Sequence, residues 1–170
     1  MSLRPVAVAL LLATALVLQT TVFPALTLLG FRPDLLLLVV VGVAVHDGPP
    51  AGVRVGAVAG LLADLLVVQA SAGVFVLVYG VVGYAVGQIR PYLAPHSLSA
   101  PTLVAFVASV VGTAAYGVFT GLLADRSVPW ELVVQVSLAV GLYNALLSPG
   151  VNLLVGALVQ RYPLRGDATD

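Results

Sequence analysis

The chain has 170 residues, of which 61% are hydrophobic and only 8% are charged, and its 7 basic and 7 acidic residues give a formal net charge of zero. A soluble domain carries roughly 25% charged residues, so this composition excludes a sizeable water-soluble domain and indicates a polytopic membrane protein. The basic residues are all arginines scattered singly, which argues against nucleic acid as a partner, and the lack of cysteine excludes disulfides and thiolate metal sites.

The first apolar stretch, residues 5–23, has about the ~20 residues that a bilayer span requires. A cleaved signal peptide is the competing interpretation. We favour a retained span, because the apolar part exceeds the usual ~7–15 residues and no small-residue cleavage signature precedes Phe23.

The second span, residues 33–47, opens with Arg32-Pro33-Asp34. Proline suits the first turn of a helix and an acidic side chain there complements the helix dipole, so Arg32 and Asp34 are interpreted as a helix start at the membrane interface. At ~1.5 Å per residue this span measures only about 22 Å, short of a ~30 Å hydrocarbon core. We expect neighbouring protein or local thinning of the bilayer to cover the difference.

The third span, residues 51–68, carries Gly52, Gly56 and Gly60 at every fourth position and continues that spacing with Asp64. In a helix these glycines form one stripe along which a neighbouring backbone can approach closely. We therefore expect this segment to be the central helix of a membrane bundle.

Burying the Asp64 carboxylate on such a stripe costs free energy unless the carboxylate meets a partner, a backbone donor or water. Two interpretations stay open: a group that binds a proton, a cation or a partner, or a carboxylate satisfied inside the bundle by Arg54, Tyr79, Tyr84 or a helix end. The motif Gly-Leu-Leu-Ala-Asp recurs with Asp125 as its last residue. The recurrence is either a parallel repeat or a coincidence in a chain rich in leucine, alanine and glycine.

The fourth span, residues 72–89, has Gly73, Gly80 and Gly87 at heptad spacing. Together with the glycines and Asp64 of the third span, they are candidate positions for helix packing or for contact with a partner. Three amides of the sixth span are expected to form hydrogen bonds between helices: Gln135, Asn144 and Asn152.

Two longer stretches, residues 102–124 and 131–160, complete the set. The last is too long for one straight span, and we expect Ser148-Pro149-Gly150 to kink it, after which the helix leaves the core and follows the cytoplasmic surface. The chain is thus predicted to be an all-α integral membrane protein with six transmembrane helices, forming a single domain over residues 1–165 with a flexible tail at 166–170.

The arginines predict the orientation of the six spans. One side of the membrane receives Arg4, Arg54, Arg90, Arg161 and Arg165, and the other receives Arg32 and Arg126. Cytoplasmic loops carry the excess of basic residues, so the first side and both termini are predicted to be cytoplasmic.

The sequence contains few residues that could form a catalytic site. His46 and His96 lie far apart with no second ligand at metal spacing. An intramembrane aspartyl protease needs two carboxylates that can share a proton, and the available pair is Asp64 with Asp125, which is expected outside the core. Phosphoryl transfer needs clustered acidic and basic groups, which are absent from the sequence. We predict no enzymatic activity, no metal and no cofactor.

Four short motifs follow one another along the chain in a characteristic order. Leu18-Gln19-Thr20 closes the first span, Arg32-Pro33-Asp34 precedes a leucine-rich run, residues 48–60 lead into Gly60-Leu-Leu-Ala-Asp64-Leu-Leu, and Gly73 leads to Tyr79, Gly83-Tyr84 and Gly87. In this order the chain resembles the bacterial rod-shape-determining protein MreD family. The second half is similar mainly in hydropathy and in Asn144 followed by Pro149.

The resemblance implies a scaffold in the peptidoglycan elongation complex of the bacterial inner membrane, which maintains cell shape. The implied partners are the bitopic protein MreC and, in a larger complex, RodA, its class B penicillin-binding transpeptidase and MreB. On this hypothesis the partner's single transmembrane helix contacts the glycine-lined faces of the third and fourth helices or the short second helix.

The same resemblance implies kinship with the six-helix substrate-binding subunits of vitamin transporters, which supplies an alternative: a small-molecule-binding membrane subunit. A carrier needs a polar cavity inside the bundle, and few polar side chains of these spans converge. The scaffold is therefore the favoured function.

Overall fold

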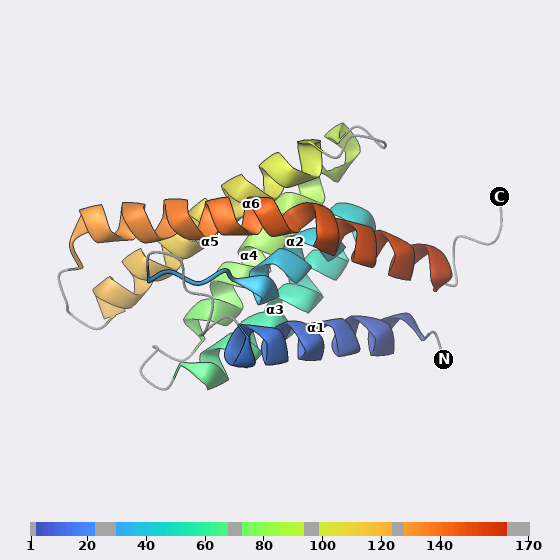
Figure 1. Ribbon diagram of the computed structural model, residues 1–170, viewed down its shortest axis with the longest axis horizontal. Helices are drawn as coiled ribbons and strands as arrows, with labels where there is room; N and C mark the ends of the chain where they lie inside the picture. Colours follow the sequence, from blue (N-terminus) through green and yellow to red (C-terminus); the bar gives the residue numbers. More distant parts are fainter. Residues whose placement is uncertain (1–2, 23–29, 68–72, 94–98, 124–127, 163–170) are drawn as a thin grey trace.

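The computed structural model describes residues 3–22, 30–67, 73–93, 99–123 and 128–162. Six α-helices follow one another along the chain and alternate in direction (Figure 1): α1 (Arg4–Thr21), α2 (Leu35–Asp47), α3 (Pro49–Leu66), α4 (Val74–Ile89), α5 (Ser99–Leu123) and α6 (Trp130–Arg161), with a short 3-10 helix, η1 (Arg90–Tyr92), after α4. Five of them are long and apolar enough to cross a membrane, and α2, with 13 residues, is shorter. The prediction of a six-helix integral membrane protein is confirmed.

The centre of the bundle is α2. Every residue from 35 to 44 is buried, and α2 packs against each of the other five α-helices. The expectation that the third span is central was wrong, because α3 leaves one face open, with Val58 51% and Leu61 55% exposed. The short α2 is therefore packed among longer helices of the same chain (Figure 1).

The glycine stripe of α3 packs against α4. A Cβ atom added at Gly52, Gly56 or Gly60 would lie less than 3.0 Å from backbone atoms of α4, a distance that real Cβ atoms essentially never show. The residues of α4 that lie opposite these glycines are, in the same order, Gly83, Tyr79 and Phe75. Small residues thus let the two backbones approach closely, as they do at other membrane helix interfaces.

Two helices have a proline in their first turn. α3 begins directly at Pro49, and α5 begins at Ser99, three residues before the expected start, with Pro101 inside its first turn. Proline is tolerated there because the first N–H groups of a helix have no partner within the helix.

The last helix stays in the bundle beyond Pro149. α6 is one helix from Trp130 to Arg161, and Val155, six residues after the proline, is 1% exposed and packs against Gly42 of α2. The prediction that the chain leaves the core near Pro149 was wrong, because the apolar face of α6 still packs against α2 after the proline. Asp125, Arg126, His96, Arg165 and the tail at 166–170 lie outside the described residues.

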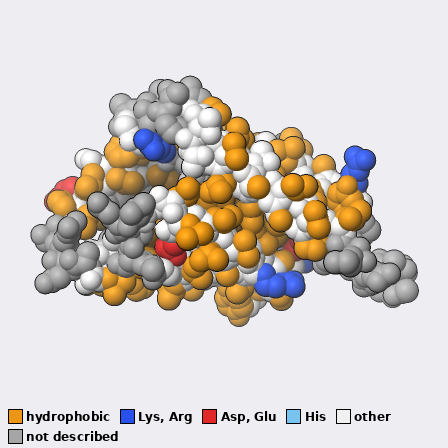
Figure 2. Space-filling model, turned by 90° about the horizontal axis from the view of Figure 1, so that it is seen from below, with side chains coloured by type: hydrophobic (Ala, Val, Ile, Leu, Met, Phe, Trp, Pro, Cys, Tyr) orange, Lys and Arg blue, Asp and Glu red, His pale blue; other side chains and the backbone are white. Residues whose placement is uncertain are grey.

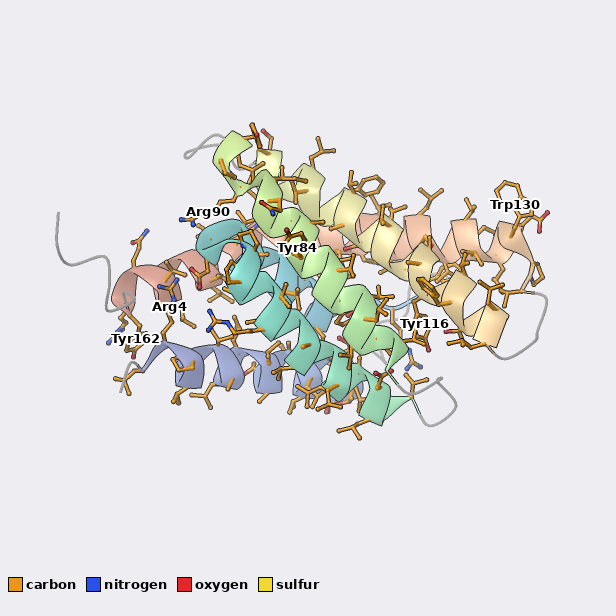
Figure 3. The ribbon with its side chains drawn as sticks, turned by 180° about the vertical axis from the view of Figure 1, so that it is seen from behind. Arg4, Tyr84, Arg90, Tyr116, Trp130 and Tyr162 are labelled. Atoms are coloured by element: carbon orange, nitrogen blue, oxygen red, sulfur yellow. The ribbon has the colours of Figure 1, made fainter. Side chains whose placement is uncertain are left out.

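The outer surface is apolar, as a lipid environment requires. Figure 2 shows hydrophobic side chains over most of one face of the molecule, with charged side chains sparse. Trp130, 69% exposed, lies at one end of the bundle, and Arg4, Arg90 and Tyr162 lie at the other (Figure 3). Aromatic and basic residues at the two ends suit the two headgroup regions of a bilayer.

Candidate functional site

Asp34 caps the first turn of the buried helix α2. Its Oδ1 atom accepts a hydrogen bond from the Leu37 N–H at 3.1 Å, and the Tyr79 hydroxyl of α4 donates to its Oδ2 atom. Both carboxylate oxygens therefore have donors, and the start of α2 is tied to α4. The exposed side chain of Arg32 lies two residues before this cap.

Two amide side chains complete the capping of α2. Gln19 of α1 accepts hydrogen bonds through Oε1 from the N–H groups of Leu35 at 3.0 Å and Leu36 at 3.3 Å. Asn144 of α6 accepts from the Asp34 N–H at 3.1 Å, and its Nδ2 atom donates to the Asp34 carbonyl at 3.0 Å.

The same Nδ2 atom of Asn144 also donates to the Ser109 hydroxyl of α5 at 2.8 Å. We call the five residues Gln19, Asp34, Tyr79, Ser109 and Asn144 the Asp34 cluster.

The cluster exists because a helix start is buried inside an apolar bundle. The first N–H groups of a helix have no intrahelical acceptor, and in a membrane each unsatisfied group costs several kcal/mol. Side chains from α1 and α6 supply acceptors that water supplies at an exposed helix end. The cluster therefore joins α1, α2, α4, α5 and α6 at one point.

A pocket of about 260 Å³ lies beside the cluster. Its lining includes Asp34 and Tyr79 together with Arg32, Phe75 and Tyr116, and the rings of Phe75 and Tyr116 stack with centroids 3.9 Å apart and an interplanar angle of 16°. Because the lining is mainly apolar and the Asp34 carboxylate is already hydrogen-bonded, the pocket offers few free polar groups to a ligand.

Asp64 caps a different helix. Its carboxylate accepts hydrogen bonds from the N–H groups of Gly73 at 3.0 Å, Phe75 at 3.3 Å and Val76 at 3.4 Å, at the start of α4. Negative charge is favourable at a helix N-terminus, so this contact joins the end of α3 to the beginning of α4. Of the two interpretations of Asp64, the geometry corresponds to a carboxylate satisfied by a helix end.

The candidate glycines divide into two groups. Gly52, Gly56 and Gly60 lie against α4, and Gly87 lies against the backbone of Pro49. A Cβ atom at Gly73, which has a φ of +94°, or at Gly80 would meet none of the described neighbouring atoms within 4 Å. The glycine stripe of α3 and residues 35–44 of α2 are thus covered by this chain, so neither forms the exposed partner surface that the sequence suggested.

Sequence reasoning missed part of this arrangement. Tyr79 was considered as a partner of Asp64, whereas its hydroxyl contacts Asp34, and Gly83 was not singled out although it lies against Gly52. The available signal was the polar residue inside an apolar span: Gln19 and Ser109 each interrupt such a run. Among the described residues, no three histidine, aspartate or glutamate side chains gather as a metal site would require.

Comparison with protein families identifies a match to most of the chain. The sequence model of the family described as rod shape-determining protein MreD matches residues 2–155, a range that includes every member of the Asp34 cluster. No curated protein and no solved structure matches the chain.

Proposed function

The chain belongs to the MreD family of rod shape-determining proteins, and from this premise we propose that it acts as a membrane-embedded scaffold of the peptidoglycan elongation complex. Family membership assigns a role in determining rod shape. The observation that carries the scaffold function is the Asp34 cluster, which joins five helices through side-chain hydrogen bonds. A bundle fixed in this way presents a constant outer surface to partner helices. The polar side chains of the Asp34 cluster form hydrogen bonds within the bundle.

We propose MreC as the direct partner, with RodA, a class B penicillin-binding transpeptidase and MreB in the larger complex. The protein would lie in the bacterial inner membrane with both termini in the cytoplasm. The distribution of arginines supports this orientation: among the described residues, Arg4, Arg54, Arg90 and Arg161 belong to one end of the alternating helices and Arg32 to the other. The positive-inside rule places the richer end in the cytoplasm.

The contact surface for MreC is proposed to be the outward face of α4. Gly80 leaves open space on this face, where a partner backbone can approach closely. One and two turns further along, Tyr84 is 50% exposed and its hydroxyl accepts a hydrogen bond from Gln88 Nε2 at 2.8 Å. A small residue beside exposed hydrogen-bonding groups is the combination that transmembrane helix pairs use.

The test is a detergent pull-down of the tagged chain from its native membranes, with mass spectrometry of the retained proteins. The wild-type chain should retain MreC, and Gly80→Val should lose most of it while its elution in size-exclusion chromatography stays unchanged, because a Cβ atom at Gly80 would meet no described atom of a neighbouring helix within 4 Å. Gly150→Val is the matched control, since Gly150 on α6 is equally open.

Two results would contradict this proposal at different levels. Release of MreC by Gly150→Val, with retention by Gly80→Val, would move the contact to α6. Recovery of an ATP-hydrolysing transporter module in place of the cell-wall synthases would favour the small-molecule-binding subunit instead. The pocket beside Asp34 supports that alternative weakly, because about 260 Å³ is below the ~300–1,000 Å³ typical of ligand sites.

A further inference from the structure

A second hollow lies at the arginine-rich end of the bundle, between α1 and α3. Its volume is about 340 Å³; α1 forms one wall, α3 the other, and Val43 and Asp47 of α2 lie at its base. It arises because α1 packs against α2 and α6 and leaves its side toward α3 open. We call this hollow the α1–α3 groove.

The polar end of the α1–α3 groove carries an excess of positive charge. Arg4 is 5% exposed and forms an ion pair with Asp47, yet its buried Nε atom has no hydrogen-bond partner. Arg54, on the opposite wall, has an exposed side chain whose Nε donates to the Pro50 carbonyl at 3.0 Å. Two guanidinium groups and one carboxylate leave a net positive charge, and a buried N–H donor lacks an acceptor.

The remainder of the α1–α3 groove is apolar. Val8 and Leu12 of α1 face Val55 and Val58 of α3 across it, with Val43 between them. Arg4 stands in the first turn of α1 and Arg54 in the second turn of α3, so both lie near the headgroup level when the two helices cross a membrane. The groove thus combines positive charge at headgroup depth with an apolar channel beneath it.

We propose that the α1–α3 groove binds one anionic glycerophospholipid. The phosphodiester lies beside the Arg4 guanidinium and accepts hydrogen bonds from the exposed guanidinium of Arg54, and an acyl chain lies along Val8 and Val58. The positive charge at headgroup depth favours an anionic lipid over an apolar transmembrane helix as the occupant. The groove holds about 340 Å³, which accommodates part of an acyl chain along its apolar wall.

The experiment is native mass spectrometry of the purified full chain in detergent, after addition of phosphatidylglycerol or of phosphatidylcholine with the same acyl chains. The wild-type chain should retain one phosphatidylglycerol in preference to phosphatidylcholine. Arg54→Gln should reduce the phosphatidylglycerol-bound fraction about fivefold, because one basic contact near a membrane surface is worth about 1 kcal/mol. Arg54 is chosen over Arg4 because Arg4 also holds the buried Asp47.

A second variant tests the apolar part of the α1–α3 groove. Ala9 is an exposed residue in the groove wall, so Ala9→Phe should fill the channel without disturbing the core and should abolish retention of either lipid. Arg161→Gln is the control, since Arg161 is exposed on α6 and does not line the groove. Size-exclusion chromatography and circular dichroism of each variant establish that it is folded.

The proposal is overturned if Arg54→Gln and Ala9→Phe retain phosphatidylglycerol as the wild type does, or if Arg161→Gln loses as much as Arg54→Gln, since binding would then be general surface attraction. It is also overturned if glycerol 3-phosphate binds as well as the lipid, because the acyl channel would contribute nothing. Displacement of the lipid by a second copy of the chain or by a co-purified single-span protein would assign the groove to a helix.

Discussion

Gly52 of α3 and Gly83 of α4 lie back to back, and a methyl group on either would collide with the carbonyl oxygen of the other. The colliding atoms belong to the backbone, so no change of rotamer can relieve the contact. The separation of the two helices is therefore set by the absence of side chains at these positions. This contact and the Asp64 cap at the other end of α3 together fix how α4 follows α3.

Substitution of either glycine should destabilise the bundle. We expect Gly83→Ala to cost at least about 1–3 kcal/mol, the usual penalty of overpacking, because α3 and α4 must move apart. Gly80→Ala, one turn away but facing open space, should be neutral or slightly stabilising, since alanine favours a helix over glycine. Thermal unfolding in detergent, followed by fluorescence-detected size-exclusion chromatography, measures both. Equal melting temperatures for the two variants would contradict the close approach.

Loss of the Tyr79 hydroxyl should weaken the cap on α2. Tyr79→Phe keeps the ring that packs in the core but leaves the Oδ2 atom of Asp34 without this donor, and a buried acceptor left unpaired costs about 1–3 kcal/mol. Tyr84→Phe provides the control, because the Tyr84 hydroxyl is exposed and pairs with Gln88. Thermal unfolding should show a lower midpoint for Tyr79→Phe alone, and an unchanged midpoint would mean that Asp34 finds another donor.

The number and type of helices were predictable from the sequence, because the length of an apolar run in a membrane chain is set by bilayer thickness. The identity of the central helix was not. A run such as residues 35–44 is equally apolar whether protein or lipid surrounds it, and the glycine stripe of α3 draws attention to a packing face without saying which helix it meets. Burial inside a membrane protein leaves no hydrophobicity signal, since lipid is as apolar as a protein core.

The candidate site was predictable only in part, for a related reason. Asp34 follows a recognisable helix-start pattern, and Asp64 stands out as a charge in an apolar run. Their partners are distant in sequence: Asn144 lies 110 positions from Asp34. Pairings at that separation depend on how α6 packs, which side-chain chemistry alone does not specify. Polar residues inside the spans could be identified as structural, but their hydrogen-bond partners could not be assigned.

Asn144 should be the most sensitive of the three amides of α6. Asn144→Leu removes a side chain that is 0% exposed and hydrogen-bonds the Asp34 backbone in both directions as well as Ser109. We expect a loss of at least about 1–3 kcal/mol, because buried backbone groups at the start of α2 lose their partner. Asn152→Leu should cost less, since Asn152 is partly exposed and donates to Ser148 within α6. The melting temperatures of the two variants in detergent test this order. A lower melting temperature for Asn152→Leu than for Asn144→Leu would show that the cap on α2 is dispensable.

Asp64 is expected to act through α4 rather than through chemistry of its own. Asp64→Leu leaves the N–H groups of Gly73, Phe75 and Val76 without their acceptor, which should lower stability by about 1–3 kcal/mol and fray the start of α4. Asp64→Asn keeps one carbonyl acceptor and should recover part of the loss, while Leu65→Ala, at a position 72% exposed, should change little. Amide hydrogen exchange of the peptide that begins α4 measures the fraying directly. Faster exchange confined to that peptide is the expected result; unchanged exchange together with lost MreC binding would make Asp64 a partner contact instead.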